Sequence, residues 1–325
     1  MSHYLVTGVA GFIASKVTEI LLSNNHIITG VDNLNEAYDI RLKDWRLKQL
    51  IGRSGFEFHQ LDICDRSALA KLWSQSEHFD AVINLAARAG VRASVENPWV
   101  YLETNTTGSL NLLELCRLNE VNKFVLASTS SLYGAHNPMP YREDTQADQP
   151  LSPYAASKKA AELLCYTYHY LYGLDVTILR YFTVYGPAGR PDMSPFRFVQ
   201  WISEGRPVIV FGDGQQSSDF TYIDDIALGT IAGLKPTGYK IINLGSDQPV
   251  VLMDAIRLIE QKVGRKAQLE FKPQHPADIK ASWADISLAR EVLDWQPRMA
   301  YEQGIENLVQ WYMENRTWAR EIKTQ

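Results

Sequence analysis

The first half of the chain alternates short apolar runs with longer stretches of helical patterning, and this alternation constrains the fold more than any other feature. Short apolar runs bounded by turn signals predict buried strands, and the stretches between them predict helices. The predicted strands are His3–Thr7, His26–Val31, Phe56–Gln60, Ala81–Leu85, Lys123–Ser128 and Asp175–Tyr181. The predicted helices are Phe12–Asn24, Arg66–Gln75, about Trp99–Asn119 and Ser152–Tyr172. Regular strand–helix alternation implies a doubly wound parallel sheet with helices on both faces, an α/β fold.

The rhythm changes after about residue 182, where Gly and Pro begin to punctuate shorter elements such as Gly186-Pro187 and Arg206-Pro207. A chain of 325 residues is also longer than one growing core usually accommodates. We therefore expect a first domain over residues 1–182 and a smaller α/β substrate-binding lobe over 183–325. The segment 220–245 is expected to return to the first domain.

Composition excludes several classes of partner. The net charge is −5 and no block of Lys or Arg occurs, so neither nucleic acid nor a membrane surface is an expected partner. No apolar run approaches the roughly 18 residues of a membrane span, and the first strand leaves no room for a signal peptide. The three cysteines, Cys64, Cys116 and Cys165, are far apart, which predicts free thiols, no metal site and a cytoplasmic protein.

A glycine-rich turn joins the first predicted strand to the first predicted helix. Gly8 permits the tight turn, Gly11 lets the backbone approach a pyrophosphate, and Ala14 is small enough for helix–strand packing. The N–H groups and partial positive charge at the helix N-terminus suit phosphates. The spacing is GxxGxxA rather than GxGxxG, and by itself it also fits an ordinary strand–helix loop.

The second predicted strand strengthens the case for a dinucleotide site of the Rossmann type. It ends at Asp32, 24 residues after Gly8, where a carboxylate can accept hydrogen bonds from the adenosine ribose hydroxyls. The same charge would repel a 2′-phosphate, so the expected cofactor is NAD rather than NADP. A turn or capping role for Asp32 is the alternative.

A Tyr–Lys pair begins the helix that precedes the last of these strands. Ser152 and Pro153 suit the N-cap and first position of a helix, which places Tyr154 and Lys158 four residues apart on one face. The pKa of a free tyrosine is about 10, and lowering it by about 3 takes roughly 4 kcal/mol. Lys158 and a cationic nicotinamide are expected to supply this, so that Tyr154 removes a proton from an alcohol. Thr129, directly after a strand, is expected to hydrogen-bond the substrate oxygen.

These three parts, in this order, resemble the extended short-chain dehydrogenase/reductase family, and the resemblance runs through most of the chain. It implies Thr129, Tyr154 and Lys158 as the catalytic residues, Asp62 near the adenine and Tyr181 on the nicotinamide side. Further segments that carry the resemblance are Leu61-Asp62-Ile63, Asn84-Leu85-Ala86-Ala87, Asn105-Thr106-Thr107-Gly108, Leu179-Arg180-Tyr181-Phe182 and Asp219-Phe220-Thr221-Tyr222. The expected NAD contacts are Gly8, Gly11, Phe12, Ile13, Asp32, Asn33, Asp62, Ile63, Leu85, Ala86, Ala87, Asn105, Ser128, Tyr154, Lys158 and Tyr181.

Within that family, the segments Ala89–Ser94, Phe182–Pro187 and Arg190–Met193 resemble UDP-glucuronate 4-epimerases. The resemblance implies NAD-dependent C4 epimerisation of a UDP-sugar, from UDP-glucuronate to UDP-galacturonate, through a 4-keto intermediate. It also implies a homodimer formed by the helices near 99–119 and 152–172. A guanidinium matches a carboxylate well, so Arg190 and Arg92 are expected at the sugar, with ordinary surface ion pairs as the alternative. The expected substrate contacts are Arg92, Thr129, Ser130, Ser131, Thr183 and Arg190.

Ser130 and Ser131 separate this chain from related chemistries. Sugar 4,6-dehydratases carry an acid pair at these positions, decarboxylating relatives usually have Glu there, and hydroxyls cannot replace that acid–base function at neutral pH. Two departures affect the nucleotide end: Ser218 replaces a usual Arg, and Pro276-Ala277-Asp278 replaces Pro-Gly-Asp. A 4-epimerase of UDP-glucose or UDP-N-acetylglucosamine and a non-catalytic NAD-binding regulator remain alternatives.

Overall fold

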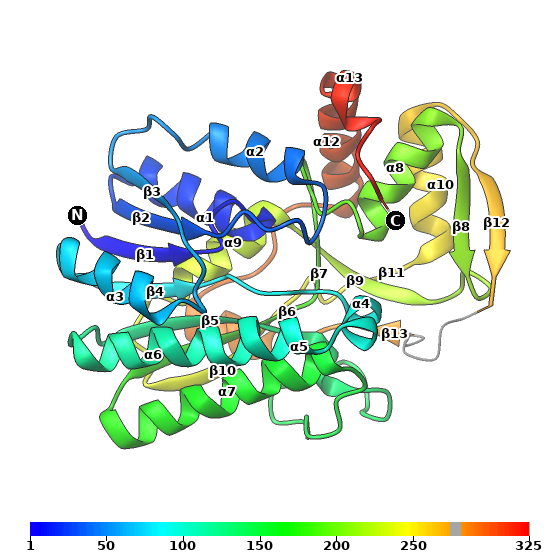
Figure 1. Cartoon of the computed structure of the whole chain (residues 1–325). Coiled ribbons are helices and arrows are strands. Elements are labelled where there is room, and N and C mark those ends of the chain that lie inside the picture. Colours follow the sequence, from blue (N-terminus) through cyan, green and yellow to red (C-terminus); the bar gives the residue numbers. More distant parts are fainter. Residues whose placement is uncertain (274–280, 325) are drawn as a thin grey trace.

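Seven parallel strands form the central sheet of the computed structural model, which describes residues 1–273 and 281–324 (Figure 1). The order across the sheet is β10-β6-β5-β4-β1-β2-β3, and every neighbouring pair is parallel. The strands are β1 (His3–Thr7), β2 (Ile27–Asp32), β3 (Phe56–Gln60), β4 (Ala81–Asn84), β5 (Lys123–Thr129), β6 (Asp175–Tyr181) and β10 (Tyr239–Leu244). Every residue of β5 is buried, as expected for a strand covered on both faces. The predicted α/β parallel sheet is confirmed.

Helices cover both faces of this sheet (Figure 1). On one face lie α1 (Phe12–Ser23), α2 (Ile40–Lys48) and α9 (Ile223–Ala232), and their apolar side chains share a core with β1 and β6. On the other face lie α3 (Arg66–Gln75), α6 (Gly108–Leu118) and α7 (Pro153–Tyr172), over a second core. The short helix α11 (Ser287–Leu293) adds Ala289 and Leu293 to the first core.

The long helix predicted near 99–119 is helical but not uniform. It consists of α5 (Trp99–Tyr101), a π-helical turn η1 (Leu102–Thr107) and α6. A Cβ atom on Gly108 would lie 2.5 Å from Cδ1 of Ile63, so glycine lets this helix approach the loop after β3 closely. The π-helical turn contains Asn105, which is fully buried.

The tyrosine-rich segment 166–172 is helical, as predicted. Ser152 caps α7 by accepting a hydrogen bond from Ala155 N at 3.2 Å, and Pro153 occupies the first helical position. The helix ends at Gly173, which has a left-handed backbone (φ 69°). Within residues 1–182, the sequence did not predict α2 and the short α4 (Val91–Glu96), and it assigned no helices beyond residue 182.

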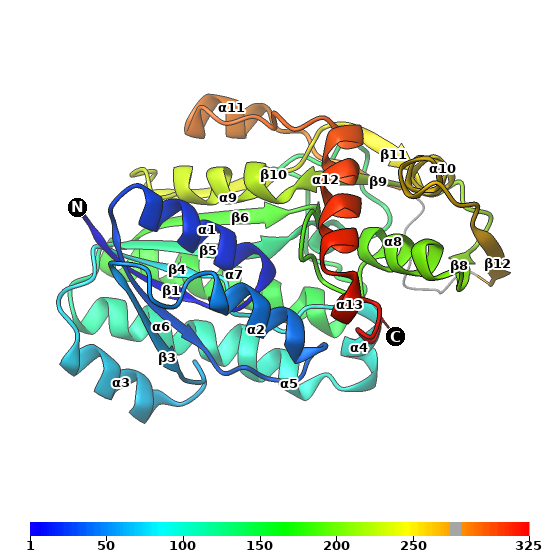
Figure 2. The ribbon, with the colours of Figure 1, turned by 90° about the horizontal axis from the view of Figure 1, so that it is seen from above.

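A smaller lobe lies beyond the carboxyl ends of the strands (Figures 1 and 2). It contains a mixed sheet of β7 (Thr183–Tyr185), β9 (Ser217–Tyr222), β11 (Pro249–Val251) and β13 (Ala281–Ser282), and the parallel pair β8 (Pro207–Phe211) and β12 (Gln268–Lys272). Its helices are α8 (Ser194–Glu204), α10 (Leu252–Val263), α12 (Tyr301–Glu314) and α13 (Arg316–Ala319). These elements pack around a third core. In the chain, α9 and β10 come between β9 and β11 of this lobe, yet β10 belongs to the central sheet and α9 packs on it. The chain therefore crosses between the lobes more than once.

Two sequence predictions are tested by the fold alone. Cys64, Cys116 and Cys165 are all free thiols. Within residues 1–273 and 281–324, no helix combines the length and the apolar character needed to cross a membrane. The departure at Pro276-Ala277-Asp278 lies outside the described residues.

Candidate active site

A cavity of about 330 Å³ opens where the strands of the large sheet end and the smaller lobe begins. All but two of the predicted site residues line it. These are Gly8, Gly11, Phe12, Ile13, Asp32, Asn33, Asp62, Ile63, Leu85, Ala86, Ala87, Ser128, Thr129, Ser130, Ser131, Tyr154, Lys158, Tyr181, Thr183 and Arg190. The two that it does not bring into the lining are Asn105 and Arg92.

The glycine turn between β1 and α1 presents protein backbone, rather than side chains, to a ligand in the cavity. Gly8 has φ +69°, and a Cβ there would lie 2.8 Å from Cα of Ala86. A Cβ on Gly11 would lie 2.8 Å from the carbonyl oxygen of Gly8. The first N–H groups of α1 have no intrahelical partners and no capping side chain, because the N-cap is Gly11, and the first residues of α1 line the cavity. This cradle fits a pyrophosphate, and any larger side chain would fill it.

Asp32 lies at the carboxyl end of β2 and is 7% exposed. One carboxylate oxygen accepts from Ala10 N at 3.2 Å, and the other accepts from Leu34 N at 2.8 Å. Nζ of Lys43 lies 3.4 Å from the second oxygen. Nearby, Asn33 donates to Asp62 at 2.7 Å, so two carboxylates are fixed at this end of the cavity. Their position suits the hydroxyls and base edge of an adenosine.

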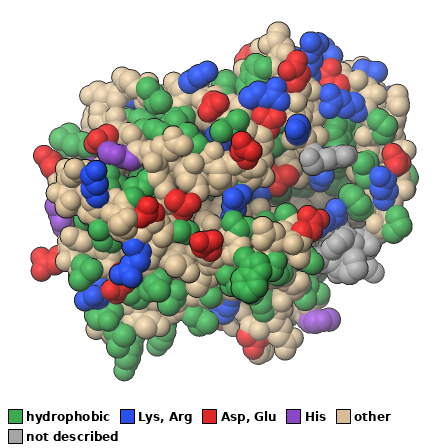
Figure 3. Space-filling model, in the orientation of Figure 1, with side chains coloured by type: hydrophobic (Ala, Val, Ile, Leu, Met, Phe, Trp, Pro, Cys, Tyr) green, Lys and Arg blue, Asp and Glu red, His purple; other side chains and the backbone are tan. Residues whose placement is uncertain are grey.

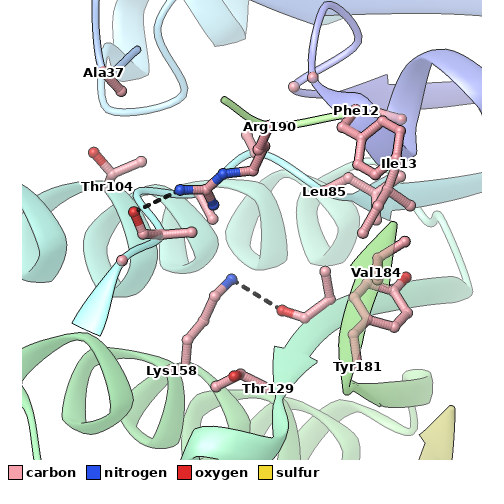
Figure 4. A pocket seen from close by; sticks show the side chains of 18 of the residues that line it. Phe12, Ile13, Ala37, Leu85, Thr104, Thr129, Lys158, Tyr181, Val184 and Arg190 are labelled. Carbon is pink, nitrogen blue, oxygen red and sulfur yellow. Dashed lines mark hydrogen bonds between the residues drawn. The ribbon is translucent and has the colours of Figure 1, made fainter. Parts of the chain in front are cut away.

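The three predicted catalytic residues all line the cavity, and Figure 4 shows Thr129 and Lys158 near the carboxyl end of β5. Lys158 is 2% exposed and donates from Nζ to the carbonyl oxygen of Ala127 at 2.9 Å. Thr129 accepts from Ser131 N at 3.2 Å. Tyr154, one helical turn before Lys158, packs edge-on against the ring of Tyr101, with the centroids 6.1 Å apart. A hydroxyl, a phenol and an amine therefore border the same space.

The electrostatics of this group differ from the sequence-based expectation. Burial lowers the pKa of Lys158 to about 8, while the nearby Cys165 and Glu162 groups oppose that change. Burial raises the pKa of Tyr154, and the Thr129 hydroxyl and the Arg190 charge oppose it. In the protein alone, desolvation thus outweighs the neighbouring charges, and the phenol stays protonated. The expected stabilisation of the phenolate requires further positive charge in the cavity.

Arg190 extends from the smaller lobe into the cavity, opposite Lys158 (Figure 4). Its Nε donates to Asp192 at 3.0 Å, and its Nη2 donates to Asp192 and to the carbonyl oxygen of Ala89 at 3.2 Å. These bonds fix the plane of the guanidinium and do not use Nη1. Thr183, Ser130 and Ser131 also line the cavity. We call these three side chains and Arg190 the polar end of the cavity, and they suit an anionic group on a sugar.

Asn105 and Arg92 have other contacts. The side-chain amide of Asn105 accepts from Arg88 N at 2.8 Å and donates to the Arg88 carbonyl oxygen at 2.9 Å. It also donates to the hydroxyl of Ser157. It therefore fastens the loop after β4 to α7 from behind the cavity. The guanidinium of Arg92 stacks 4.1 Å above the ring of Phe211 in β8, beyond the lining residues.

Sequence reasoning missed several residues of the lining. They include Tyr38, Lys43, Ala89, Thr104 and Met193. Tyr38 and Lys43 flank the start of α2, which was not predicted because its apolar residues are few. The signal was present, since Asp39 accepts from Arg41 N and is a good N-cap.

Known proteins match this chain over nearly its whole length. Residues 4–245 match the model of the NAD dependent epimerase/dehydratase family. The chain is 56% identical to a UDP-glucuronate 4-epimerase of Thermodesulfobacterium geofontis (strain OPF15), over 99% of this chain and 100% of that protein. Among solved structures, UDP-glucuronic acid 4-epimerase from Bacillus cereus in complex with UDP-glucuronic acid and NAD superposes with a TM-score of 0.89 at 36% identity. That match covers 96% of this chain and 99% of the other.

A second solved structure differs in its sugar. UDP-glucose 4-epimerase from Thermotoga maritima with UDP-glucose superposes with a TM-score of 0.90 at 29% identity. The match covers 97% of this chain and 99% of the other.

Proposed function

This chain belongs to the NAD dependent epimerase/dehydratase family, and from that premise we propose that it is a UDP-glucuronate 4-epimerase. It interconverts UDP-glucuronate and UDP-galacturonate through a transient 4-keto sugar. The observation that carries the choice of substrate is Arg190, whose fixed guanidinium faces the cavity opposite Lys158. Asp192 already pairs with Nε and Nη2 of Arg190, and a neutral sugar would leave Nη1 without an acidic acceptor.

The cofactor is NAD, which takes up and returns the hydride of the sugar C4 when bound. Gly8 and Gly11 shape the turn that receives the pyrophosphate, and the free N–H groups at the start of α1 bind it. Asp32 binds the adenosine ribose hydroxyls and repels a 2′-phosphate. Lys158, whose amine donates to the Ala127 carbonyl, would bind the other ribose.

Tyr154 acts as the base and later as the acid. It removes the proton of the C4 hydroxyl, holds it while the ketone exists, and returns it to the new alcohol. Thr129 donates a hydrogen bond to the same oxygen, which stabilises the charge that develops there. The positive charge that Tyr154 lacks in the protein alone has to come from the filled cavity, so proton removal is tied to cofactor binding.

The polar end of the cavity binds the sugar carboxylate. Asp192 and the Ala89 carbonyl hold Arg190 in one orientation, which leaves Nη1 for the substrate. Ser130, Ser131 and Thr183 are small hydroxyl residues, so the ketone has room to turn over and present its other face. The hydroxyls can hydrogen-bond the carboxylate in both orientations.

A panel of UDP-sugars tests this function. Purified protein is incubated without added cofactor with UDP-glucuronate, UDP-glucose or UDP-N-acetylglucosamine, and the products are identified by NMR. We expect UDP-galacturonate from UDP-glucuronate, and no product with Tyr154→Phe. Faster epimerisation of UDP-glucose would favour the neutral-sugar alternative, to which the similarity with the Thermotoga maritima enzyme also points. An active Tyr154→Phe protein would refute the mechanism.

We also propose that the enzyme is a cytoplasmic homodimer. Apolar side chains lie exposed on α6 and α7, among them Leu118 (61%), Leu163 (58%) and Tyr170 (75%). Figure 3 shows hydrophobic side chains along the lower part of the molecule, where these two helices lie in Figure 1. Pairing the two helices with those of a second copy would bury this surface.

A further inference from the structure

Arg46 lies at the junction of the two lobes and is almost completely buried, with 2% exposure. It belongs to α2. Its Nε donates to the carbonyl oxygen of Ala188 at 3.0 Å, and its Nη2 donates to the same oxygen at 2.7 Å and to that of Gly189 at 3.3 Å. Its Nη1 donates to the carbonyl oxygen of Ala10 at 3.2 Å and to the hydroxyl of Tyr38 at 2.7 Å. One guanidinium thus connects segments more than 130 residues apart.

Every acceptor around Arg46 is neutral. The guanidinium also lies over the rings of Phe12 and Tyr38, at 5.7 and 5.5 Å from their centroids. Within the part of the chain that the structure describes, Arg46 makes no ion pair. A buried cation without a counterion is costly, even when all its N–H groups are hydrogen-bonded. This arrangement therefore indicates that the compensating negative charge belongs to a ligand.

The position of Arg46 identifies that charge. Ala10 lies inside the glycine turn, and Phe12 begins α1, so the guanidinium stands directly behind the cradle for the pyrophosphate. The pyrophosphate of a dinucleotide carries two negative charges. Arg46 does not reach the cavity lining, so it acts through the field it adds to the turn and through the backbone it holds.

The other side of Arg46 holds the loop that carries Arg190. Ala188 has φ 52°, a left-handed backbone that a residue with a side chain rarely adopts. Its carbonyl oxygen receives two of the bonds from Arg46, and the next carbonyl receives a third. Arg190 follows directly. The conformation that aims Arg190 into the cavity thus depends on a residue of the cofactor-binding domain.

We infer that Arg46 is a positioning residue that couples NAD binding to the placement of Arg190, and hence to recognition of the sugar carboxylate. The inference rests on the proposed function. In thermodynamic terms, NAD and UDP-glucuronate should each raise the affinity for the other, and Arg46 should carry that coupling. The positive charge of Arg46 favours NAD binding, whereas its N–H donors hold the loop at Ala188 and Gly189 that leads to Arg190.

Two substitutions separate these roles. Arg46→Gln removes the charge and most donors, whereas Arg46→Lys keeps the charge but cannot reach all four acceptors. Both are made in a Tyr154→Phe parent, so that no turnover occurs. Arg41→Gln is the matched control, because Arg41 lies on the same helix, is half-exposed and pairs with Asp39 and Glu321 away from the cavity.

The dissociation constant of NAD is measured on cofactor-stripped protein by calorimetry, with and without UDP-glucuronate. The coupling factor is the ratio of the two constants, and we expect at least about fivefold in the parent and in Arg41→Gln. Arg46→Gln should weaken NAD binding by about tenfold or more, and its coupling factor should approach one. Arg46→Lys should bind NAD within about threefold of the parent but lose the coupling.

Unchanged NAD affinity in Arg46→Gln, or an intact coupling factor in Arg46→Lys, would overturn the inference. A role confined to stability predicts a lower melting temperature with both binding quantities intact, which also overturns it. If Arg46→Gln fails to fold, Arg46→Lys still decides the coupling. Failure of UDP-glucuronate to bind the parent would refute the proposed function instead, and the NAD constants alone would then decide the charge effect.

Discussion

Lys158 shows, at the scale of single residues, that burial of an amine in the cavity reduces the stability of the fold. Its amine is buried beside a backbone carbonyl and has no carboxylate as a direct partner in the part of the chain described. Burial accordingly lowers its pKa to about 8, from 10.5. A protonated amine in this place destabilises the fold, and a hydrogen-bonding ligand in the cavity would offset that destabilisation.

Replacing this amine should stabilise the cofactor-free protein. Below pH 8, Lys158 is protonated in both the folded and the unfolded state, so the destabilisation caused by burying its charge is fully present. Between pH 8 and 10.5 only the unfolded state keeps the proton, so the free energy of unfolding rises with pH. At about 1.36 kcal/mol per pKa unit, Lys158→Met should gain roughly 3 kcal/mol at neutral pH. The gain should shrink towards pH 10 in denaturant titrations. A variant less stable than the wild type at pH 7 would contradict the buried charge.

Arg190 should determine the choice between acidic and neutral sugars. Arg190→Ala removes the charge-assisted hydrogen bond from Nη1 to the carboxylate, so kcat/KM for UDP-glucuronate should fall about a hundredfold or more. The value for UDP-glucose should change by less than about threefold. Arg257→Ala, an exposed arginine paired with Asp254, is the control and should leave both values unchanged. Equal losses on both sugars would mean that Arg190 only supports the loop.

At the scale of elements, the site depends on how closely one segment approaches another. The turn after β1 touches the strand end at Ala86, and α6 touches the loop after β3 at Gly108. Neither approach is visible in hydropathy patterning, because a glycine contributes no apolar signal. Both follow from where the parallel strands end.

Comparing Gly8 with Gly52 distinguishes two effects of replacing a glycine, a clash with a neighbouring segment and strain in a left-handed backbone. Gly8 (φ +69°) would place a Cβ against Ala86, whereas Gly52 (φ +85°) has no atom within 4 Å of that position. Gly52→Ala should cost about 1 kcal/mol of stability and leave NAD binding unchanged. Gly8→Ala should release NAD during purification, seen as the absence of the cofactor in the denatured supernatant. Retention of NAD in Gly8→Ala would show that the turn is not the pyrophosphate site.

The elements also show what the sequence could and could not predict. Strands β1 to β6 and helices α1, α3 and α7 were predicted within a residue or two, because alternating apolar runs and helix caps mark them directly. Helix α2 was missed, since most of its residues are polar and its few buried positions include Lys43 and Arg46. Lys43 contacts Asp32 on the preceding strand and Arg46 contacts Ala188, 142 residues later, so the helix's own sequence pattern does not show why these two side chains are buried.

The same limit applies to the site. Glycines, acids and the Tyr–Lys pair carry short motifs, and the structure brings them to one cavity. Arg92 has a motif too, but its side chain stacks on Phe211, more than a hundred residues away. Its partner is set by the packing of the smaller lobe against the first domain.

At the scale of the whole molecule, the cavity requires both lobes, because β2 and β5 supply one wall and the loop after β7 supplies the other. The exposed face of α6 and α7 lies on the side of the sheet away from α1 and α9.

Charges placed on that face should prevent assembly. Leu163 and Tyr170 are 58% and 75% exposed, so Leu163→Glu with Tyr170→Glu should not disturb the monomer's core. We expect a dimer for the wild type and a monomer for the double variant by sedimentation velocity. Met313→Glu, a 39% exposed apolar residue on α12, serves as the control and should remain dimeric. A monomeric wild type would refute the proposed dimer.

The central claim is that the sugar is oxidised and reduced at C4 within one cavity, without exchange of the hydride with water. UDP-glucuronate carrying deuterium at C4 is incubated with the purified protein in ordinary water, with no cofactor added, and the product is examined by NMR and mass spectrometry. The account predicts UDP-galacturonate that keeps the deuterium at C4. UDP-galacturonate that carries hydrogen instead of deuterium at C4 would contradict it, because the label would then have been lost to water.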